Sequence, residues 1–423
     1  MFLVSRVVGL GVSFIMLASV SFCTHADSVL SLSEAQQLAL KKDPGIKRFN
    51  ALAHAMEEKA VAAGQLPDPK MKIGLMNFPT DTFRRDQEPM TQIQVGYQQM
   101  FPRGKSLEIK SQQSLSGARV QAQRAAERQR AIRQSVRLKW LEYYYWVQAE
   151  KIVHKNRSLF EQLVEVAQFH YGAGRRNQQD VVRAQLELSR LDDRILDIKT
   201  RQEKVRAELG VLIDRPASGI ILPEKLPLLV NEFSLPRMLE ALETHPKILA
   251  AIAMVDRGRQ GVSLAREAYK PSWGLGVTYG LRDGQNGAGQ DRPDFLSVGV
   301  TFDLPLFRDK RQDRKLKASQ FSLGASQQMR DQQYLDLKLS LEREYANWLR
   351  LTERVRFYHE MLVPQAKQNT EAALFAYQND RADFSTVMKA RITELNTELK
   401  SIRIHVNRAK SEARLLYISG EEQ

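Results

Sequence analysis

The stretch QVGYQQMFPRGK, Gln94 to Lys105, joins an alternating segment to a long helical pattern. Much later the chain repeats the same kind of junction as SVGVTFDLPLFRDK, Ser297 to Lys310. Alternation of apolar and polar residues over such a length is typical of a half-buried strand. A proline neither donates to a strand ladder nor fits inside a helix. Pro102 and Pro305 therefore mark two similar strand-to-helix junctions. Gly104 lies two residues after Pro102 in the first of them.

The repetition extends over most of the chain. Motifs of the first half recur in the same order about two hundred residues later, as expected for an internal repeat. They pair Pro44-Gly45-Ile46 with Pro246-Lys247-Ile248, Ile73-Gly74-Leu75 with Leu275-Gly276-Val277, and Tyr171-x-x-Gly174-Arg175 with Tyr377-x-x-Asp380-Arg381. We expect a first structural repeat at 27–213, a proline-bearing linker at 214–233 and a second repeat at 234–423.

Each repeat is expected to run helix, strand, strand, long helix, turn, helix. The alternating segments place the strands at about 70–77 and 91–101 in the first repeat, and at about 272–281 and 295–304 in the second. The turns are expected at 171–180 and 377–384, where glycine, asparagine and aspartate gather. The fold class is therefore mainly α-helical with a smaller β part.

The helices of each repeat are expected to be unusually long. No proline occurs between Arg103 and Arg215, and a helix over 106–170 would reach roughly 100 Å. Helices over 34–66 and 177–213 would together cover nearly the same length. Small and apolar residues of the long helix fall on a seven-residue seam typical of a coiled coil, namely Leu115, Ala118, Ala122, Ala125, Ile132 and Val136. Each repeat is thus expected to form a two-rod hairpin.

The first 26 residues differ from the rest. Arg6 precedes an apolar run that ends at Phe22, and small residues precede Asp27, which indicates a secretory signal peptide cleaved after Ala26. A membrane anchor is one alternative, although the run is shorter than the ~20 residues of a spanning helix. A second alternative makes Cys23, the only cysteine of the chain, the acylated first residue of a lipoprotein. A chain beginning at Asp27 has no cysteine for a disulfide or a thiol nucleophile.

The formal net charge of +14 does not by itself indicate nucleic acid as a partner. The 63 lysines and arginines are scattered among 49 acidic residues instead of forming one basic block. Such mixing is typical of the solvated faces of long helices.

The strands carry the strongest information about environment. Their apolar residues share one face, and small or polar residues such as Gln94, Gly96, Ser297 and Gly299 share the other. The expected apolar face includes Ile93, Val95, Tyr97, Trp273, Leu275, Val277, Leu296, Val298 and Val300. Alternation over about ten residues is the signature of a transmembrane β-strand, although a half-buried soluble sheet fits any single strand. Four strands are too few to close a barrel, so several chains would each contribute a share.

The sequence resembles the TolC-like outer-membrane efflux proteins across essentially the whole mature chain. The resemblance rests on the duplicated unit, the Gln99-Met100-Phe101-Pro102-Arg103-Gly104-Lys105 junction, the Leu222-Pro223 and Leu226-Pro227 linker, and the turn from Tyr377 to Phe384 with Val387, Met388 and Ala390. It implies a homotrimer in the outer membrane, with a twelve-stranded β-barrel continued by a helical barrel across the periplasm. It also implies a periplasmic adaptor protein and an inner-membrane pump, of the RND type, as partners.

Within that family, GQLPDPKMKIGLMNFP and the stretch ending in FPRGK look most like the heavy-metal efflux branch. The cargo would then be heavy-metal cations. Drug efflux and type I protein secretion by the same duct stay open as alternatives. The histidines occur singly, so no metal cage is expected, and Met71, Met76, Met90 and Met100 are more typical of barrel packing than of a Cu(I) site.

The two turns should lie at the far ends of the rods, where a periplasmic partner has access. We expect the gate and the adaptor contact there, carried by Tyr171, Gly174, Arg175, Asp180, Tyr377, Arg381 and Asp383. Many members of the family have glycine where Asp380 stands. TolC-like gates place acids where this chain has Thr386 and Lys389, so the residues of the closed aperture stay undetermined.

A passive duct without cofactor or catalytic residues is the favoured function. The sequence has no GxSxG, HExxH or phosphate-binding loop that would indicate an enzyme. A secreted coiled-coil scaffold is the remaining rival of a different class.

Overall fold

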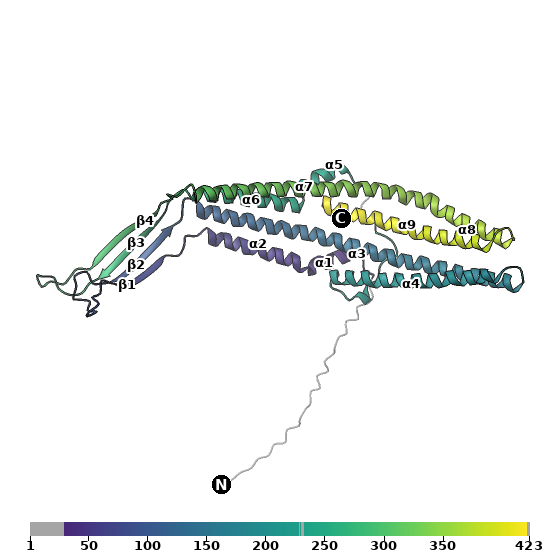
Figure 1. The fold of residues 1–423 in the computed structure, drawn as a ribbon, viewed down its shortest axis with the longest axis horizontal. Helices are drawn as coiled ribbons and strands as arrows, with labels where there is room; N and C mark the ends of the chain where they lie inside the picture. The colour runs from purple at the N-terminus through teal and green to yellow at the C-terminus, as the bar shows by residue number, and fades with distance from the viewer. Residues whose placement is uncertain (1–28, 228, 230–231, 421–423) are drawn as a thin grey trace, which may run out of the picture.

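The structure is a computed structural model that describes residues 29–227, 229 and 232–420. The predicted signal peptide, with Cys23, lies outside these residues. The described chain is elongated, with a β-sheet at one end and two helical hairpins at the other (Figure 1).

The first repeat contains four helices and two strands. They are α1 (Leu32–Lys42), α2 (Pro44–Ala63), β1 (Lys70–Met76), β2 (Gln92–Phe101), α3 (Ser106–Gly172) and α4 (Gln178–Ile213). A short 3₁₀ turn, Ala217–Gly219, follows in the linker.

The second repeat has the same order of elements. They are α5 (Leu235–Ala241), α6 (Pro246–Glu267), β3 (Ser272–Leu281), β4 (Phe295–Asp303), α7 (Gln312–Phe357), α8 (Val363–Gln378) and α9 (Phe384–Ser419), with a 3₁₀ turn at Leu242–Thr244 and a π-helical turn at Tyr358–Leu362. The predicted fold class, mainly α-helical with two tandem helix-strand-strand-helix-helix units, is confirmed. Among the described residues no helix is apolar enough over a sufficient length to span a membrane.

The prediction of one helix over 34–66 was wrong, because the chain breaks there into α1 and α2. Asp43 precedes Pro44, and a proline disfavours the helical conformation at the residue before it. The carboxylate of Asp43 accepts a hydrogen bond from the N–H of Ile46 at 2.8 Å and caps the second helix. The second repeat breaks in the same way before Pro246, where the His245 side chain accepts from the N–H of Lys247 at 3.1 Å.

The long rods of the two repeats differ in continuity. Helix α3 runs for 67 residues without interruption. Its counterpart consists of α7 with 46 residues, a five-residue π-helical turn and α8 with 16 residues. Pro364 lies in the first turn of α8 and cannot donate the hydrogen bond that would continue α7. The wider π turn accommodates the proline.

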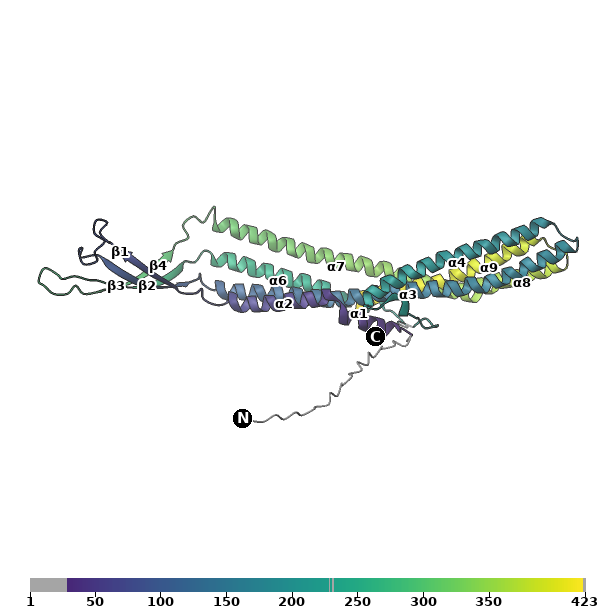
Figure 2. The ribbon, with the colours of Figure 1, turned by 90° about the horizontal axis from the view of Figure 1, so that it is seen from below.

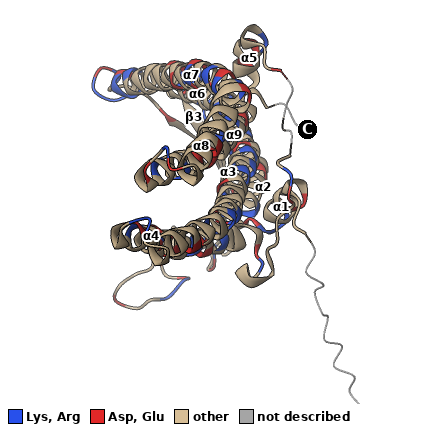
Figure 3. Ribbon diagram, turned by 90° about the vertical axis from the view of Figure 1, so that its right-hand side faces the viewer, with Lys and Arg blue, Asp and Glu red and all other residues tan. Residues whose placement is uncertain are grey.

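The rods form one curved layer. Helix α3 packs on α2 and α6 in the half near the sheet, and on α4 and α9 in the half near the tips. The two halves meet at an angle near α1 (Figure 2). Seen along the rods, the layer is an arc, α1 lies on its convex side, and both signs of charge are interspersed over the helices (Figure 3).

The largest part of the core lies around the middle of α3. Trp140 is fully buried and donates its ring N–H to the carbonyl of Leu30 at 3.1 Å. Leu30 in turn donates its N–H to Ile221 at 2.7 Å, and a parallel bridge joins Val29 to Ile221. The start of the first repeat and the linker are therefore fastened together across α3.

The predicted coiled-coil seam is correct only in part. Ala118, Ala125, Ile132 and Val136 are buried, whereas Leu115 and Ala122 are exposed. Near the sheet, Ser116 and Gly117 are buried in place of Leu115. Small side chains there let the backbones of neighbouring helices approach each other.

A half-buried ionic cluster joins the two repeats at mid-rod. Arg403 on α9 donates to the carboxylate of Glu142 on α3 at 3.0 Å, and Lys410 donates to the same carboxylate. Burial opposes ionisation of Glu142, but the bonds and charges of Lys410 and Arg403 keep its pKa below the usual value. The guanidinium of Arg403 also lies 3.3 Å from the ring centre of Tyr145.

Candidate functional site

The first candidate site is the sheet, whose strands follow the order β1-β2-β3-β4 with antiparallel neighbours. Pairing in register aligns the apolar residues of all four strands. One row reads Ile73, Val95, Tyr279, Leu296, and the next reads Met71, Tyr97, Val277, Val298. Because side chains alternate along each strand, these rows lie on the same face.

This apolar face is open in the single chain. Ile73 is 71 % exposed, Val298 is 66 % exposed, and even in the central strand β3 Val277 is 37 % exposed. The predicted residues on this face that are exposed are Val95, Tyr97, Trp273, Leu275, Val277, Leu296, Val298 and Val300, and Ile93 is half-buried. Soluble monomers seldom leave so large a contiguous apolar surface in water.

The opposite face has a different character. Register aligns Gly96 with Thr278, and Thr278 with Ser297, so small and hydroxylated side chains form its rows. Gln94 and Gln98 add amides to the same face. The sheet therefore presents one apolar surface and one surface suited to water.

Both edges of the sheet lack a neighbour. β1 pairs only with β2, and β4 pairs only with β3, among the strands of the described chain. Unpaired N–H and C=O groups along a strand edge are a template for another strand.

The strand-to-helix junctions lie directly below the sheet. Gly104 has φ +45°, and an added Cβ would collide with the carboxylate of Glu267, which accepts the N–H of Lys105 at 2.9 Å. Arg103 donates to the carbonyl of Ala268 at 2.8 Å and to Asp303. These contacts fasten the start of α3 to the second repeat. Pro305 lies in the loop between β4 and α7.

The second candidate site is the pair of turns at the far ends of the rods. Gly174 has φ +68° in the first turn, and Asp380 has φ +57° in the second. Both residues follow the last helical turn in the left-handed conformation that closes a helix. Aspartate adopts this conformation at some cost, which glycine does not incur.

One ion pair connects the two turns within the chain. Arg176 donates to the carboxylate of Asp380 at 3.1 Å and lies over the ring of Tyr377, 5.3 Å from its centre. Sequence reasoning missed Arg176, because the repeat aligned its neighbour Arg175 with Arg381. The left-handed position of Asp380, which aims its side chain across to the first turn, is not encoded in that alignment.

The structure separates six of the seven predicted tip residues into three groups. Arg175, Asp180 and Asp383 line a polar cavity of about 280 Å³ between the turns, with Arg176 and Arg183. Tyr171 and Arg381 are exposed beside it. Gly174 shapes the turn.

Tyr377 has a different place from the one expected, because it lies in the core of the tip and does not form a surface link. It is 1 % exposed and packs edge to face on His170 and Phe384, with ring centres 5.5 Å apart in both cases. Burial raises the pKa of its hydroxyl. Thr386 and Lys389, at the positions of the usual acidic gate, are exposed on α9.

No cluster of three or more potential metal ligands from histidine, cysteine, aspartate and glutamate occurs in the described ranges. Of the methionines near the strands, Met71 lies on the apolar face, whereas Met76 and Met100 fall on the opposite face by register.

The comparisons with known proteins agree with this geometry. Residues 238–421 match the family model described as outer membrane efflux protein. No curated protein matches the chain.

Solved structures of outer-membrane channels have the same fold over nearly the whole length. The outer-membrane channel OprN superposes with a TM-score of 0.78 at 15 % identity, over 92 % of this chain and 90 % of its own. The outer membrane protein VceC from Vibrio cholerae gives 0.78 at 16 % identity, over 92 % and 96 %. CusC, for which transmembrane channel formation is described, gives 0.77 at 12 % identity, over 92 % of each chain.

The family model matches the second repeat, and the first repeat has the same elements in the same order, within a fold shared with outer-membrane channels. The second repeat therefore matches the outer membrane efflux protein family, and the described chain as a whole has the fold of solved outer-membrane channels.

Proposed function

We propose that three copies of this chain form the exit duct of a tripartite efflux system, which receives its cargo from an inner-membrane pump through a periplasmic adaptor. The observation that carries the proposal is the sheet, with one exposed apolar face, one polar face and two free edges. Lipid covers an apolar face of this kind, and water covers the other. β2 and β3, at ten residues each, have the length that crosses a bilayer as a tilted strand.

The free edges support a ring of identical chains. The β4 edge of one copy can pair with the β1 edge of the next, and three copies with four strands each reach the range of closed barrels. Such a contact joins two different surfaces of the same chain, and it gives a closed ring of three when each copy is rotated by a third of a turn from the last.

The helices support the same assembly. Helices α2 and α4 lie at one side of the arc, and α7 and α8 lie at the other. Exposed large apolar residues occur on both sides, namely Val61, Val182, Leu186 and Leu196 on the first and Phe321, Leu335, Leu339 and Phe375 on the second. Burial of these residues between copies would continue the ring from the barrel to the tips.

The tip supports the proposed gate and adaptor contact. Its cavity is lined almost wholly by polar atoms of Arg175, Arg176, Asp180 and Asp383, and the ion pair between Arg176 and Asp380 holds the two turns together. Polar links in water are weak and exchange readily, which suits an end that opens and closes. Behind them Tyr377 and Phe384 form a packed base for the turns.

For the cargo we propose heavy-metal cations. The support is the resemblance of the segment around Pro69 and of the FPRGK junction to the heavy-metal branch. Drug molecules or secreted proteins are the alternatives. A secreted scaffold is disfavoured, because a protein surrounded by water would leave the apolar face of the sheet exposed to solvent.

The test begins with the native membrane. We expect the mature protein in the outer-membrane fraction, resistant to extraction by salt, and as a trimer after crosslinking. A monomer that salt removes would overturn the proposal. A deletion strain complemented by this chain then distinguishes the cargo, because restored resistance to metal salts alone, to drugs alone, or to neither separates the alternatives.

A further inference from the structure

The cavity directly beneath the sheet contains cations that neither the fold nor the assembly explains. It has a volume of about 450 Å³ and lies where α3 and α7 begin and α6 ends. Arg103, Lys110 and Lys315 line it, together with Ser106 and Ser272. Both lysines are exposed, and their side chains make no ion pair or hydrogen bond among the described residues. Lys315 lies in the first turn of α7, where a cation opposes the helix dipole, so helix stability does not account for it.

The carboxylates beside this cavity are bound to other groups. Glu267 lines it, but its carboxylate accepts the N–H of Lys105 at 2.9 Å and pairs with Lys270 at 2.8 Å. Asp303 pairs with Arg103. The two lysines of the cavity therefore keep a positive charge that these carboxylates do not neutralise.

The cavity lies on the polar side of the sheet. Ser272 pairs with Asp303 in register, one position from the pair of Trp273 with Phe302 on the apolar face. Because side chains alternate along a strand, Ser272 and Asp303 point away from that face. The hydroxyl of Ser272 donates to the carboxylate of Asp303 at 3.3 Å, and Arg103 donates to the same carboxylate. Arg103 and the cavity that it lines are thus on the side that we propose water covers.

The next cavity along the same three helices continues this surface. It has a volume of about 400 Å³, and the residues that line it contain no carboxylate. Arg257 of α6 lines it with Gln113, Ser319 and Ser322, and no ion pair of Arg257 occurs in the described part of the chain. Lys315, Ser319 and Ser322 follow one another at helical spacing on one face of α7, so both cavities lie on the same side of the helical layer.

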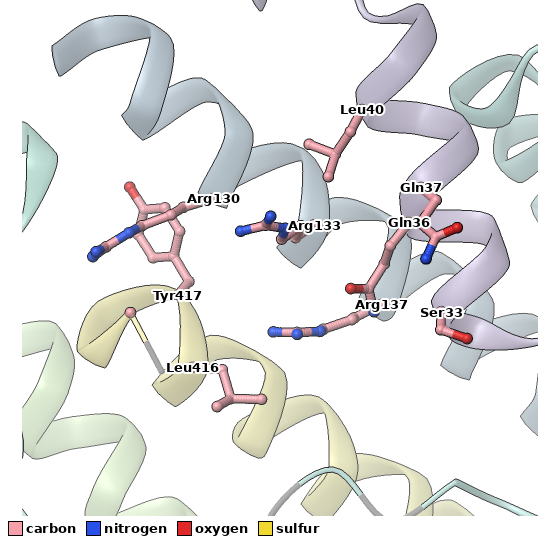
Figure 4. Close-up of a pocket in the computed structure, with 10 residues that line it drawn as sticks. Ser33, Gln36, Gln37, Leu40, Arg130, Arg133, Arg137, Leu416 and Tyr417 are labelled. Carbon is pink, nitrogen blue, oxygen red and sulfur yellow. The ribbon is translucent and has the colours of Figure 1, made fainter. Parts of the chain in front are cut away.

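The cations on the convex side of the layer are different. Arg130, Arg133 and Arg137 project from successive turns of α3 into a pocket beside α1 (Figure 4). Each of these arginines makes an interaction in the structure, so the fold accounts for them. The lysines beneath the sheet have no such contact, which indicates a role outside the single chain.

We propose that these cavities form a ring of cationic sites in the assembled duct, which attracts anions where the barrel meets the helices. Three copies would repeat Lys110, Arg257 and Lys315 around one water-filled space. A ring of like charges between walls of low dielectric constant raises the local concentration of counter-ions, and rings of lysine and arginine select anions in pores. Free cations are repelled at this level, so a metal cargo passes it more readily as an anionic complex. This inference rests on the proposed channel and does not depend on its cargo.

The test is the reversal potential of the purified trimer in a planar bilayer with a gradient of potassium chloride. We expect the unmodified channel to prefer chloride over potassium by about twofold or more, and Lys110→Gln combined with Lys315→Gln to remove most of that preference. Lys110→Glu combined with Lys315→Glu should reverse it. The matched control is Lys317→Gln, which removes the same charge from an exposed lysine of α7 that lies about 200° around the helix from Lys315.

The outcomes separate this inference from the proposed function. If the protein forms no channel, the proposed function fails together with this inference. If the protein conducts but prefers potassium, if the double glutamine variant keeps the chloride preference, or if Lys317→Gln removes as much of it, this inference alone is overturned. Lys110→Arg combined with Lys315→Arg keeps both charges and should keep the preference, and its loss there would likewise overturn the inference.

Discussion

The two repeats share their order of elements but differ in how firmly their hairpins are built. The first has an uninterrupted rod and a glycine in its tip turn, whereas the second has a π-helical turn before Pro364 and an aspartate at the equivalent left-handed position. A π turn and a strained residue both store a local cost within one hairpin. A duplicated fold can thus keep one copy as a rigid frame and concentrate deformable elements in the other.

Substitutions in the sheet should affect the two repeats alike. We expect the largest loss of stability there. Val95→Lys in the first repeat and Val298→Lys in the second should each cost about 2 to 4 kcal/mol per chain, because each places a charge near mid-strand on the face that we propose lipid covers. Gln94→Lys and Ser297→Lys, on the opposite face, should be mild. Heat resistance of the trimer on gels measures the loss. Equal loss in all four variants would refute the assignment of the faces.

The rods test the difference between the repeats. Ser158 lies as far along α3 as Pro364 lies along the second rod. Ser158→Pro should therefore destabilise the protein by about 3 kcal/mol, because it interrupts an intact helix. Pro364→Ala should stabilise the protein and lower channel opening, since the second rod could then continue as a regular helix. Thermal unfolding and planar-bilayer conductance are the measurements. If Pro364→Ala raised conductance, the second hairpin would not be the deformable one.

The helix breaks before Pro44 and before Pro246 are expected to affect the stability of the fold in different ranges of pH. Burial, with a smaller effect from Arg130, lowers the pKa of His245 from 6.5 to about 4. The unfolded chain then takes up a proton near pH 6.5 that the folded chain resists, so stability is greatest above pH 6.5 and falls as pH decreases toward 4. The loss should reach roughly 3 kcal/mol. Unfolding measured between pH 4 and pH 8 should show this slope, and His245→Asn should remove it.

At the equivalent break, Asp43 stabilises the fold in its charged form, whereas His245 does so in its neutral form. The pKa of Asp43 is lowered first by the hydrogen bond from Arg128, so it stabilises the fold when ionised. That contribution is present above the ordinary value of 3.8 and is lost only as pH falls through the lower folded pKa. Asp43→Asn should therefore leave the slope between pH 4 and pH 8 intact. A loss of that slope in this variant would show that His245 is not its source.

The tip should give the smallest effect on stability and a clear effect on conductance. Arg176→Gln or Asp380→Asn breaks an exposed ion pair and should change the free energy of unfolding by less than about 1 kcal/mol. Either variant should raise single-channel conductance, since the link between the turns is lost. Lys199→Gln, an exposed residue of α4 that has no ion pair among the described contacts and lies outside the tip cavity, is the matched control. Unchanged conductance in all three would place the aperture elsewhere along the helices.

Much of this architecture follows from the sequence because it depends on local rules. Alternation located the strands to within about a residue or two, and the absence of proline located the long rods. The break at Asp43 was also readable, since an aspartate before proline is a cap signal, but the helical pattern on both sides concealed it.

What the sequence could not supply is pairing across long distances. The contact of Arg176 with Asp380 depends on how two turns from different repeats approach each other, and the burial of Tyr377 depends on His170 and Phe384 closing around it. A tyrosine in a polar turn looks like a surface residue when only its neighbours in sequence are considered. The π turn likewise needed the structure, because proline alone does not determine whether a helix kinks, widens or stops.

The fastening of Leu30 to Ile221 across Trp140 also constrains the order of folding. It closes a loop that contains nearly all of the first repeat, so these partners meet only after the linker has been synthesised. Local helical hairpins form much faster than contacts of such sequence separation. We therefore expect the contact between Leu30 and Ile221 to be the last part of the first repeat to fold.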